Sequence, residues 1–148
     1  MNKINYWAVI AAAVAAFLMS SLYYSPLLLG DIWRAVDPAA VVNASAAKAA
    51  AEFLRTLIIT LVIARILTLL GGHGWRSGFR LALLLWFAFS AMMWTGAVMW
   101  ENTPWQLAAI HSGDWLVKTA LIALIVGVWH DKKLRRMTHG SRVSVREA

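Results

Sequence analysis

Four long apolar segments constrain the fold of this chain more than any other feature of its sequence. They lie at about residues 5–24, 50–70, 79–100 and 107–129. Each is close to the ~20 residues that an α-helix needs to cross the hydrocarbon core of a bilayer. The chain has 148 residues, 61% of them hydrophobic, which is more apolar surface than a soluble domain of this size can bury. The sequence therefore predicts an all-α membrane protein, with four transmembrane helices in residues 1–131 and a basic tail in residues 132–148.

Basic residues in the short connections predict the orientation of these helices. Lys3 precedes the first segment, Arg76 and Arg80 follow the second, and the basic tail follows the fourth. Cytoplasmic connections of membrane proteins carry an excess of Lys and Arg, so we expect an up-down-up-down antiparallel bundle with both termini in the cytoplasm. The net charge of +7 then indicates the flank of a membrane span, with no nucleic-acid partner. Four tail cations are expected to contact lipid headgroups: Lys132, Lys133, Arg135 and Arg136.

Small side chains recur at every fourth position of the first segment, at Ala8, Ala12, Ala16 and Ser20. This spacing places them on one stripe of a helix, where the backbone of another helix can approach closely. The stripe predicts a helix-packing surface. A single sequence leaves open whether the stripe contacts a helix of the same chain or of a second copy.

Two acid–base pairs fall inside the second and fourth apolar segments. Glu52 and Arg55 are three residues apart, and Asp114 and Lys118 are four apart, so each pair shares a helix face. The two pairs lie at a similar depth, and His111 is one turn from Asp114, so the five residues predict one intramembrane polar cluster. Two interpretations remain open: an ion network that fixes the helices in register, or a site that binds a polar ligand or relays a proton.

Several kinds of chemistry have no pattern in this sequence. The chain contains no Cys, and it lacks the HExxH, GxSxG, P-loop and GxGxxG motifs as well as any run of carboxylates suited to a metal. We therefore expect no metal, no cofactor and no catalytic residue.

Three functional hypotheses are consistent with these patterns. The favoured one is a non-enzymatic subunit or scaffold that packs against other transmembrane helices, in a homo-oligomer or a larger complex. The second is a small transporter or polar-ligand-binding protein that uses the charged cluster. The third is a membrane enzyme on a lipophilic substrate, with Glu101 or His111 as its acid–base group.

Several short motifs give the chain a resemblance to a known family. They are Tyr6-Trp7-Ala8-Val9, Tyr23-Tyr24-Ser25-Pro26-Leu27-Leu28-Leu29-Gly30 with Trp33, Glu101-x-x-Pro104-x-x-Leu107-x-x-Ile110-x-x-Gly113, and Gly127-x-Trp129. With these motifs the chain resembles a widespread domain-of-unknown-function family of small four-helix bacterial membrane proteins. The resemblance implies a four-span protein of the bacterial inner membrane with no assigned activity.

The resemblance also singles out particular positions. They are Tyr24, Ser25, Pro26, Glu101 and Pro104. The family usually carries an aromatic residue where this chain has Asp114, which leaves open whether the Asp114–Lys118 pair is a family feature or a device of this protein alone. Pro26 and Pro104 lie where a segment meets the external interface, as is typical of residues that end helices.

Overall fold

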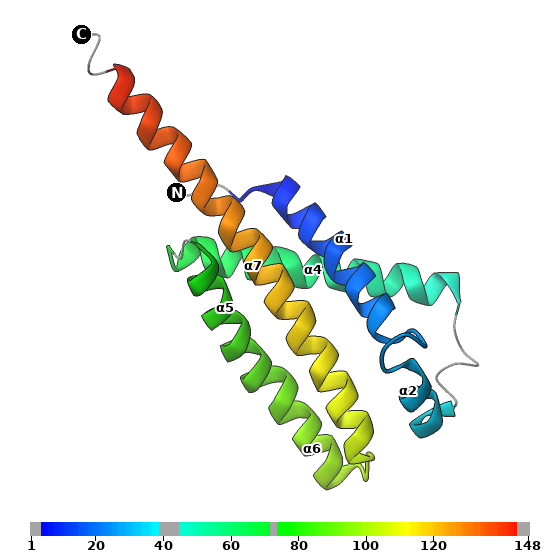
Figure 1. Ribbon diagram of the computed structural model, residues 1–148. Coiled ribbons are helices and arrows are strands. Elements are labelled where there is room, and N and C mark those ends of the chain that lie inside the picture. Colours follow the sequence, from blue (N-terminus) through cyan, green and yellow to red (C-terminus); the bar gives the residue numbers. More distant parts are fainter. Residues whose placement is uncertain (1–3, 39–44, 72–73, 145–148) are drawn as a thin grey trace.

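The computed structural model describes residues 4–38, 45–71 and 74–144, with side chains as far as Trp129. All regular secondary structure in these ranges is helical (Figure 1). The helices are α1 (Tyr6–Tyr23), α2 (Gly30–Val36), α4 (Ala46–Leu69), α5 (Gly74–Leu85), η1 (Trp86–Ala91), α6 (Met92–Trp100) and α7 (Trp105–Ser144). The predicted all-α class is confirmed for the described residues.

Three helical stretches in the described ranges are long and apolar enough to cross a membrane. They are Tyr6–Tyr23, Gly74–Trp100 and Trp105–Trp129, which correspond to the first, third and fourth predicted spans. The second predicted span forms α4, a helix of 24 residues. It is not among the three stretches, and it carries four charged side chains: Lys48, Glu52, Arg55 and Arg65. A fourth crossing by α4 therefore stays a prediction.

Helix α7 occupies the centre of the arrangement. It packs against α1, α4, α5 and α6, and Figure 1 shows it running in the direction opposite to α1 and to the α5–α6 segment. In the same view α4 crosses these helices obliquely. The fourth predicted span, residues 107–129, lies within α7, which continues beyond it to Ser144 as one helix of 40 residues.

The small-residue stripe of α1 lies inside the molecule. Ala8, Ala12 and Ala16 are buried, and Ala12 and Ala16 belong to the core cluster that includes Ile63 of α4 and Ile122 of α7. Their small side chains let α4 and α7 approach α1 closely. The stripe therefore contacts helices of its own chain.

A glycine permits a second close approach, between α5 and α7. A Cβ atom at Gly78 would clash with the backbone carbonyl group of Ala123. Because glycine has no side chain, the two helix backbones can contact each other there.

The third predicted span is not a uniform α-helix. Its middle, η1, has π-helical hydrogen bonding, in which each carbonyl is bonded to an amide five residues later. The π-helix begins at Trp86, whose indole N–H donates to the carbonyl oxygen of Ser112 (2.8 Å) and also lies 3.1 Å from the Ser112 hydroxyl. These contacts hold η1 against α7.

Candidate functional site

The loop between α1 and α2 positions two aromatic side chains. The Gly30 N–H donates to the Ser25 carbonyl oxygen at 2.9 Å, and a Cβ atom at Gly30 would clash with the carbonyl groups of Tyr24 and Ser25. Only glycine fits this tight turn, which folds α2 back toward α1. As a result the ring of Trp33 contacts the ring of Tyr24 edge-on, with centroids 5.0 Å apart. The Tyr-Ser-Pro motif thus builds a turn that brings α2 beside the site.

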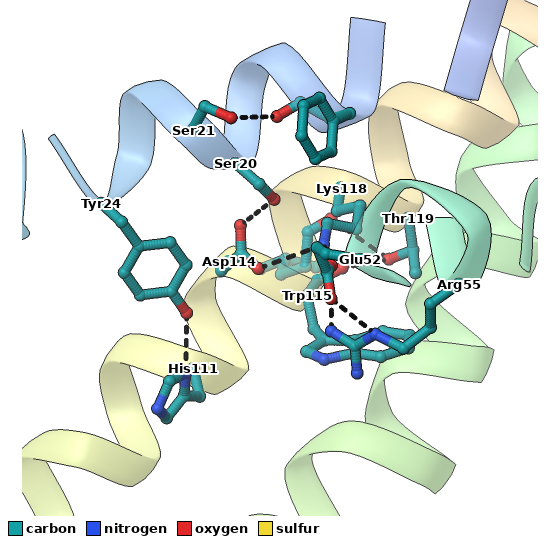
Figure 2. A network of polar contacts seen from close by, with 12 residues as sticks. Ser20, Ser21, Tyr24, Glu52, Arg55, His111, Asp114, Trp115, Lys118 and Thr119 are labelled. Atoms are coloured by element: carbon teal, nitrogen blue, oxygen red, sulfur yellow. Dashed lines mark hydrogen bonds and ion pairs between the residues drawn. The ribbon is translucent and has the colours of Figure 1, made fainter. Parts of the chain in front are cut away.

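Lys118 lies at the centre of the polar cluster. Its ammonium nitrogen is 2.8 Å from Oε1 of Glu52 and 3.6 Å from Oδ2 of Asp114, and its side chain is only 2% exposed. The other carboxylate oxygen of Asp114 accepts a hydrogen bond from the Ser20 hydroxyl at 2.5 Å. Figure 2 shows that these contacts connect α1, α4 and α7. The structure therefore brings the two predicted acid–base pairs into one network.

The network becomes more exposed from Lys118 toward Arg55. Arg55 contacts Glu52 with two nitrogens, Nε at 2.8 Å and Nη2 at 3.0 Å, and the side chains of Arg55 and Glu52 are 53% and 32% exposed. Burying the Lys118 ammonium is costly unless opposite charges and hydrogen bonds compensate it, and two carboxylates do so here. Arg55 keeps part of its guanidinium free to contact a molecule outside the network.

A cavity of about 530 Å³ lies beside these charges. Its volume falls within the range of ~300–1,000 Å³ that is typical of small-molecule sites. The four charged residues of the predicted cluster line it, and so do Lys48, the hydroxyl groups of Ser20, Ser21 and Tyr24, and the rings of Phe17, Trp33 and Trp115. The ion network is therefore the wall of a cavity and does not close on itself.

His111 also lines the cavity, and its contacts are separate from the ion network. Its Nδ1 atom is 2.7 Å from the hydroxyl oxygen of Tyr24, and its ring stacks on Trp94, with centroids 4.8 Å apart and planes 15° from parallel. Among the contacts of the described residues, no hydrogen bond joins His111 to Asp114 or Glu52. A proton relay through all three groups would therefore need a bridging molecule.

Glu101 and Pro104 lie outside the cavity. Glu101 is the exposed residue that ends α6, and Asn102 after it has the positive φ of 55° that tight turns often require. The carbonyl oxygen of Pro104 accepts the N–H of Ala108 in the first turn of α7. This motif forms the connection between α6 and α7. In the part of the chain with described side chains, no three His, Asp or Glu residues gather to hold a metal ion.

Lys48 and Trp33 are among the lining residues of the cavity that were not predicted from the sequence. Lys48 precedes Glu52 by four residues and Arg55 by seven on α4, so helical periodicity alone places it on the same face. Trp33 gave no such signal, because only the turn at Gly30 brings α2 to the cavity. The predicted headgroup cations of the tail, Lys132, Lys133, Arg135 and Arg136, lie beyond the described side chains.

Comparison with known proteins identifies the family of this sequence. No curated protein and no solved structure matches the chain. The sequence profile of a family described as "Protein of unknown function (DUF1761)" matches residues 7–127, which include every helix that lines the cavity. The chain therefore belongs to the DUF1761 family.

Proposed function

We propose that this membrane protein binds a small anionic molecule in the charged cavity, as a ligand-binding protein or a small transporter. The observation that carries the proposal is the position of the ion network. The network lines a cavity of about 530 Å³, and its exposed end presents the guanidinium of Arg55. An ion network that served only to fix the helices in register would have no need of such a space.

The balance of charge favours an anion. Three cations line the cavity, Lys48, Arg55 and Lys118, against two carboxylates, Glu52 and Asp114, so one positive charge is in excess when His111 is neutral. Lys48 forms no ion pair among the described contacts. A carboxylate or phosphate in the cavity would therefore form charge-assisted hydrogen bonds with Lys48 and Arg55.

A donor without a partner in the same wall supports this assignment. The indole Nε1 atom of Trp33 is buried and has no hydrogen-bond acceptor within the described residues. A buried donor left unpaired costs about 1–3 kcal/mol. After a small shift of the Trp33 ring, a ligand oxygen would accept a hydrogen bond from this indole N–H and remove the cost of leaving it unpaired.

The proposal includes a location and a topology. Four crossings, with α4 as the second, would place both termini in the cytoplasm and the charged cavity in the outer half of a bacterial inner membrane. The ligand would then enter from the external side. The cations of the tail would contact anionic lipid headgroups on the cytoplasmic side.

Cysteine labelling tests the charge preference of the cavity without knowledge of the natural ligand. The chain has no Cys, so Ala49→Cys introduces a single thiol in the cavity wall. Ala47→Cys provides an exposed thiol on the same helix outside the cavity. Each variant would be labelled with a sulfonate-bearing and a trimethylammonium-bearing methanethiosulfonate. We expect the ratio of anionic to cationic labelling rates to be about fivefold higher at position 49, as one unit charge at close range predicts.

A matched pair of arginine variants provides the control for this experiment. Arg55 and Arg34 each contact an acid three residues earlier, Glu52 and Asp31, but only Arg55 lines the cavity. Adding Arg55→Gln to Ala49→Cys should abolish the preference for the anionic reagent, whereas Arg34→Gln should leave it unchanged. Equal rate ratios at positions 47 and 49 would refute the proposal.

A subunit of a homo-oligomer or larger complex is the second candidate, and the surface of the α5–α6 segment favours it. Large apolar side chains there are strongly exposed, among them Phe89 (70%) and Trp100 (83%). In a bilayer this surface contacts either lipid or the helices of a partner. Measurement of the mass of the purified protein in detergent would test this candidate, since two or more copies per particle would support it and a single copy would count against it. An enzymatic role has less support: of its two proposed acid–base groups, Glu101 lies outside the cavity, and His111 lines it without a hydrogen bond to a carboxylate among the described contacts.

A further inference from the structure

A second cavity lies next to the charged one and has a different character. It is a groove of about 440 Å³ between α4, the end of α5, η1, α6 and α7. Its walls are almost entirely hydrocarbon and aromatic, with Ile58, Val62 and Ile66 of α4 facing Leu85, Phe89 and Met93. Phe89 and Met93 are also exposed on the outer surface of the helices, so the groove opens toward the surrounding hydrocarbon.

Trp115 lines both cavities. On the charged side, the guanidinium carbon of Arg55 lies 5.4 Å from the centre of this ring, and the Lys118 nitrogen lies 6.0 Å from it. Figure 2 shows Arg55 extended over Trp115. The polar space and the apolar space thus have the Trp115 side chain in common.

Helices α4 and α7 change character at the same level. On α4 the residues that line the charged cavity end at Arg55, and those that line the groove begin at Ile58, less than one turn later. On α7 the two linings overlap, because Trp115 lines both spaces, Lys118 lines only the charged cavity and Thr119 lines only the groove. The charged cavity and the apolar groove are thus neighbours that share Trp115 as a lining residue.

We infer that these two neighbouring spaces hold an anionic amphiphile, with its carboxylate or phosphate head in the charged cavity and its hydrocarbon chain in the groove. The inference rests on the proposed function, because it assigns the ligand's head to the same cations. The chain would pass Trp115 into the neighbouring groove, whose walls have the same aliphatic character as a lipid chain. Trp115 lies between the head and the chain, where its ring contacts the cations on one side and hydrocarbon on the other.

Protection of the Ala49→Cys thiol against the sulfonate-bearing reagent measures occupancy of the site. The probes are sodium butyrate, sodium dodecanoate and dodecanol, added to the protein in nanodiscs of zwitterionic lipid. Butyrate carries the head without a chain that reaches the groove, and dodecanol carries the chain without the charge. We expect dodecanoate to protect at a concentration about tenfold or more below that of butyrate, since each further buried methylene group strengthens binding. Dodecanol should not protect.

Two tryptophan substitutions on α4 distinguish binding of dodecanoate in the groove from a general effect of dodecanoate on the lipid bilayer. Val62 and Leu61 are both exposed, but only Val62 lines the groove. Val62→Trp should raise the concentration of dodecanoate needed for protection to that of butyrate. Protection by butyrate should be unchanged in this variant, and this result would show that the charged cavity is still folded. Leu61→Trp should change neither. Ile58→Trp, at another exposed position of the groove wall, is a second variant with the same expected result.

The outcomes distinguish failure of the inference from failure of the proposed function. Equal protection by butyrate and dodecanoate, or equal effects of Val62→Trp and Leu61→Trp, would overturn the amphiphile and leave an anion-binding cavity. Absence of protection by both butyrate and dodecanoate would overturn the anion-binding function itself, and the amphiphile with it.

Discussion

Among single residues, Lys118 is the one whose surroundings most affect the free energy of unfolding. Its ammonium is buried between Glu52 and Asp114, so neither carboxylate can be lost without leaving a buried charge poorly compensated. Asp114 is itself buried and holds the Ser20 hydroxyl of α1. These side chains therefore join three helices and also form the deepest wall of the proposed site.

Asp114→Asn should lower the free energy of unfolding by about 3 kcal/mol, the order found when one partner of a buried ion pair is removed. Asp31→Asn is the matched control. Asp31 contacts Arg34 on the surface, with a side chain that is 73% exposed, and loss of such a pair costs less than about 1 kcal/mol. Denaturation in detergent, followed by circular dichroism, measures both variants. Losses of equal size would show that the Asp114 contact contributes no more than a surface ion pair.

At the scale of helices, glycines decide how closely α5 and α7 approach. Gly78 faces the backbone of Ala123, whereas a Cβ atom at Gly96 of α6 would meet nothing within 4 Å. This contact fixes the position of the segment that continues into η1. It thereby fixes the groove that η1 forms with α4.

The two glycines give opposite predictions for the same substitution. Gly78→Ala should lower the free energy of unfolding by roughly 1–3 kcal/mol, because an overpacked contact forces the backbones apart. Gly96→Ala should raise it, by up to about 1 kcal/mol, since alanine favours the helix more than glycine does. Thermal unfolding of both variants in the same detergent tests this pair. A destabilised Gly96→Ala or an unaffected Gly78→Ala would contradict the packing described here.

At the scale of the whole molecule, the position of α4 determines the topology. Three stretches satisfy the length and composition of a membrane span, and α4 carries the charges that line the cavity. Because Glu52 is paired with Lys118 and Arg55, much of the cost of placing these charges at membrane depth is offset inside the protein. We therefore expect α4 to cross the bilayer with the other three.

Single cysteines in the cysteine-free chain test this topology. Ser77→Cys, in the first turn of α5, should react with an impermeant thiol reagent only from the cytoplasmic side. Gln106→Cys, at the start of α7, should react only from the external side, because the α5–α6 segment separates the two positions. Labelling of both variants from one side would refute a crossing by the α5–α6 segment. Labelling of Ser77→Cys from outside would refute the crossing of α4 for a chain whose N-terminus is cytoplasmic.

The sequence by itself determined the helical class, three stretches long and apolar enough to cross a membrane, and the pairing of charges within each helix. These features depend on composition and on the spacing of residues three or four apart, which a sequence displays directly. The contact of Lys118 with Glu52 joins residues 66 positions apart, and the turn at Gly30 brings Trp33 beside Tyr24. Periodicity reports which residues share a face of one helix, but not which faces of different helices meet. Only the tertiary structure therefore decided that the alanine stripe packs inside the chain, that the paired charges line a cavity, and that an apolar groove shares Trp115 with that cavity.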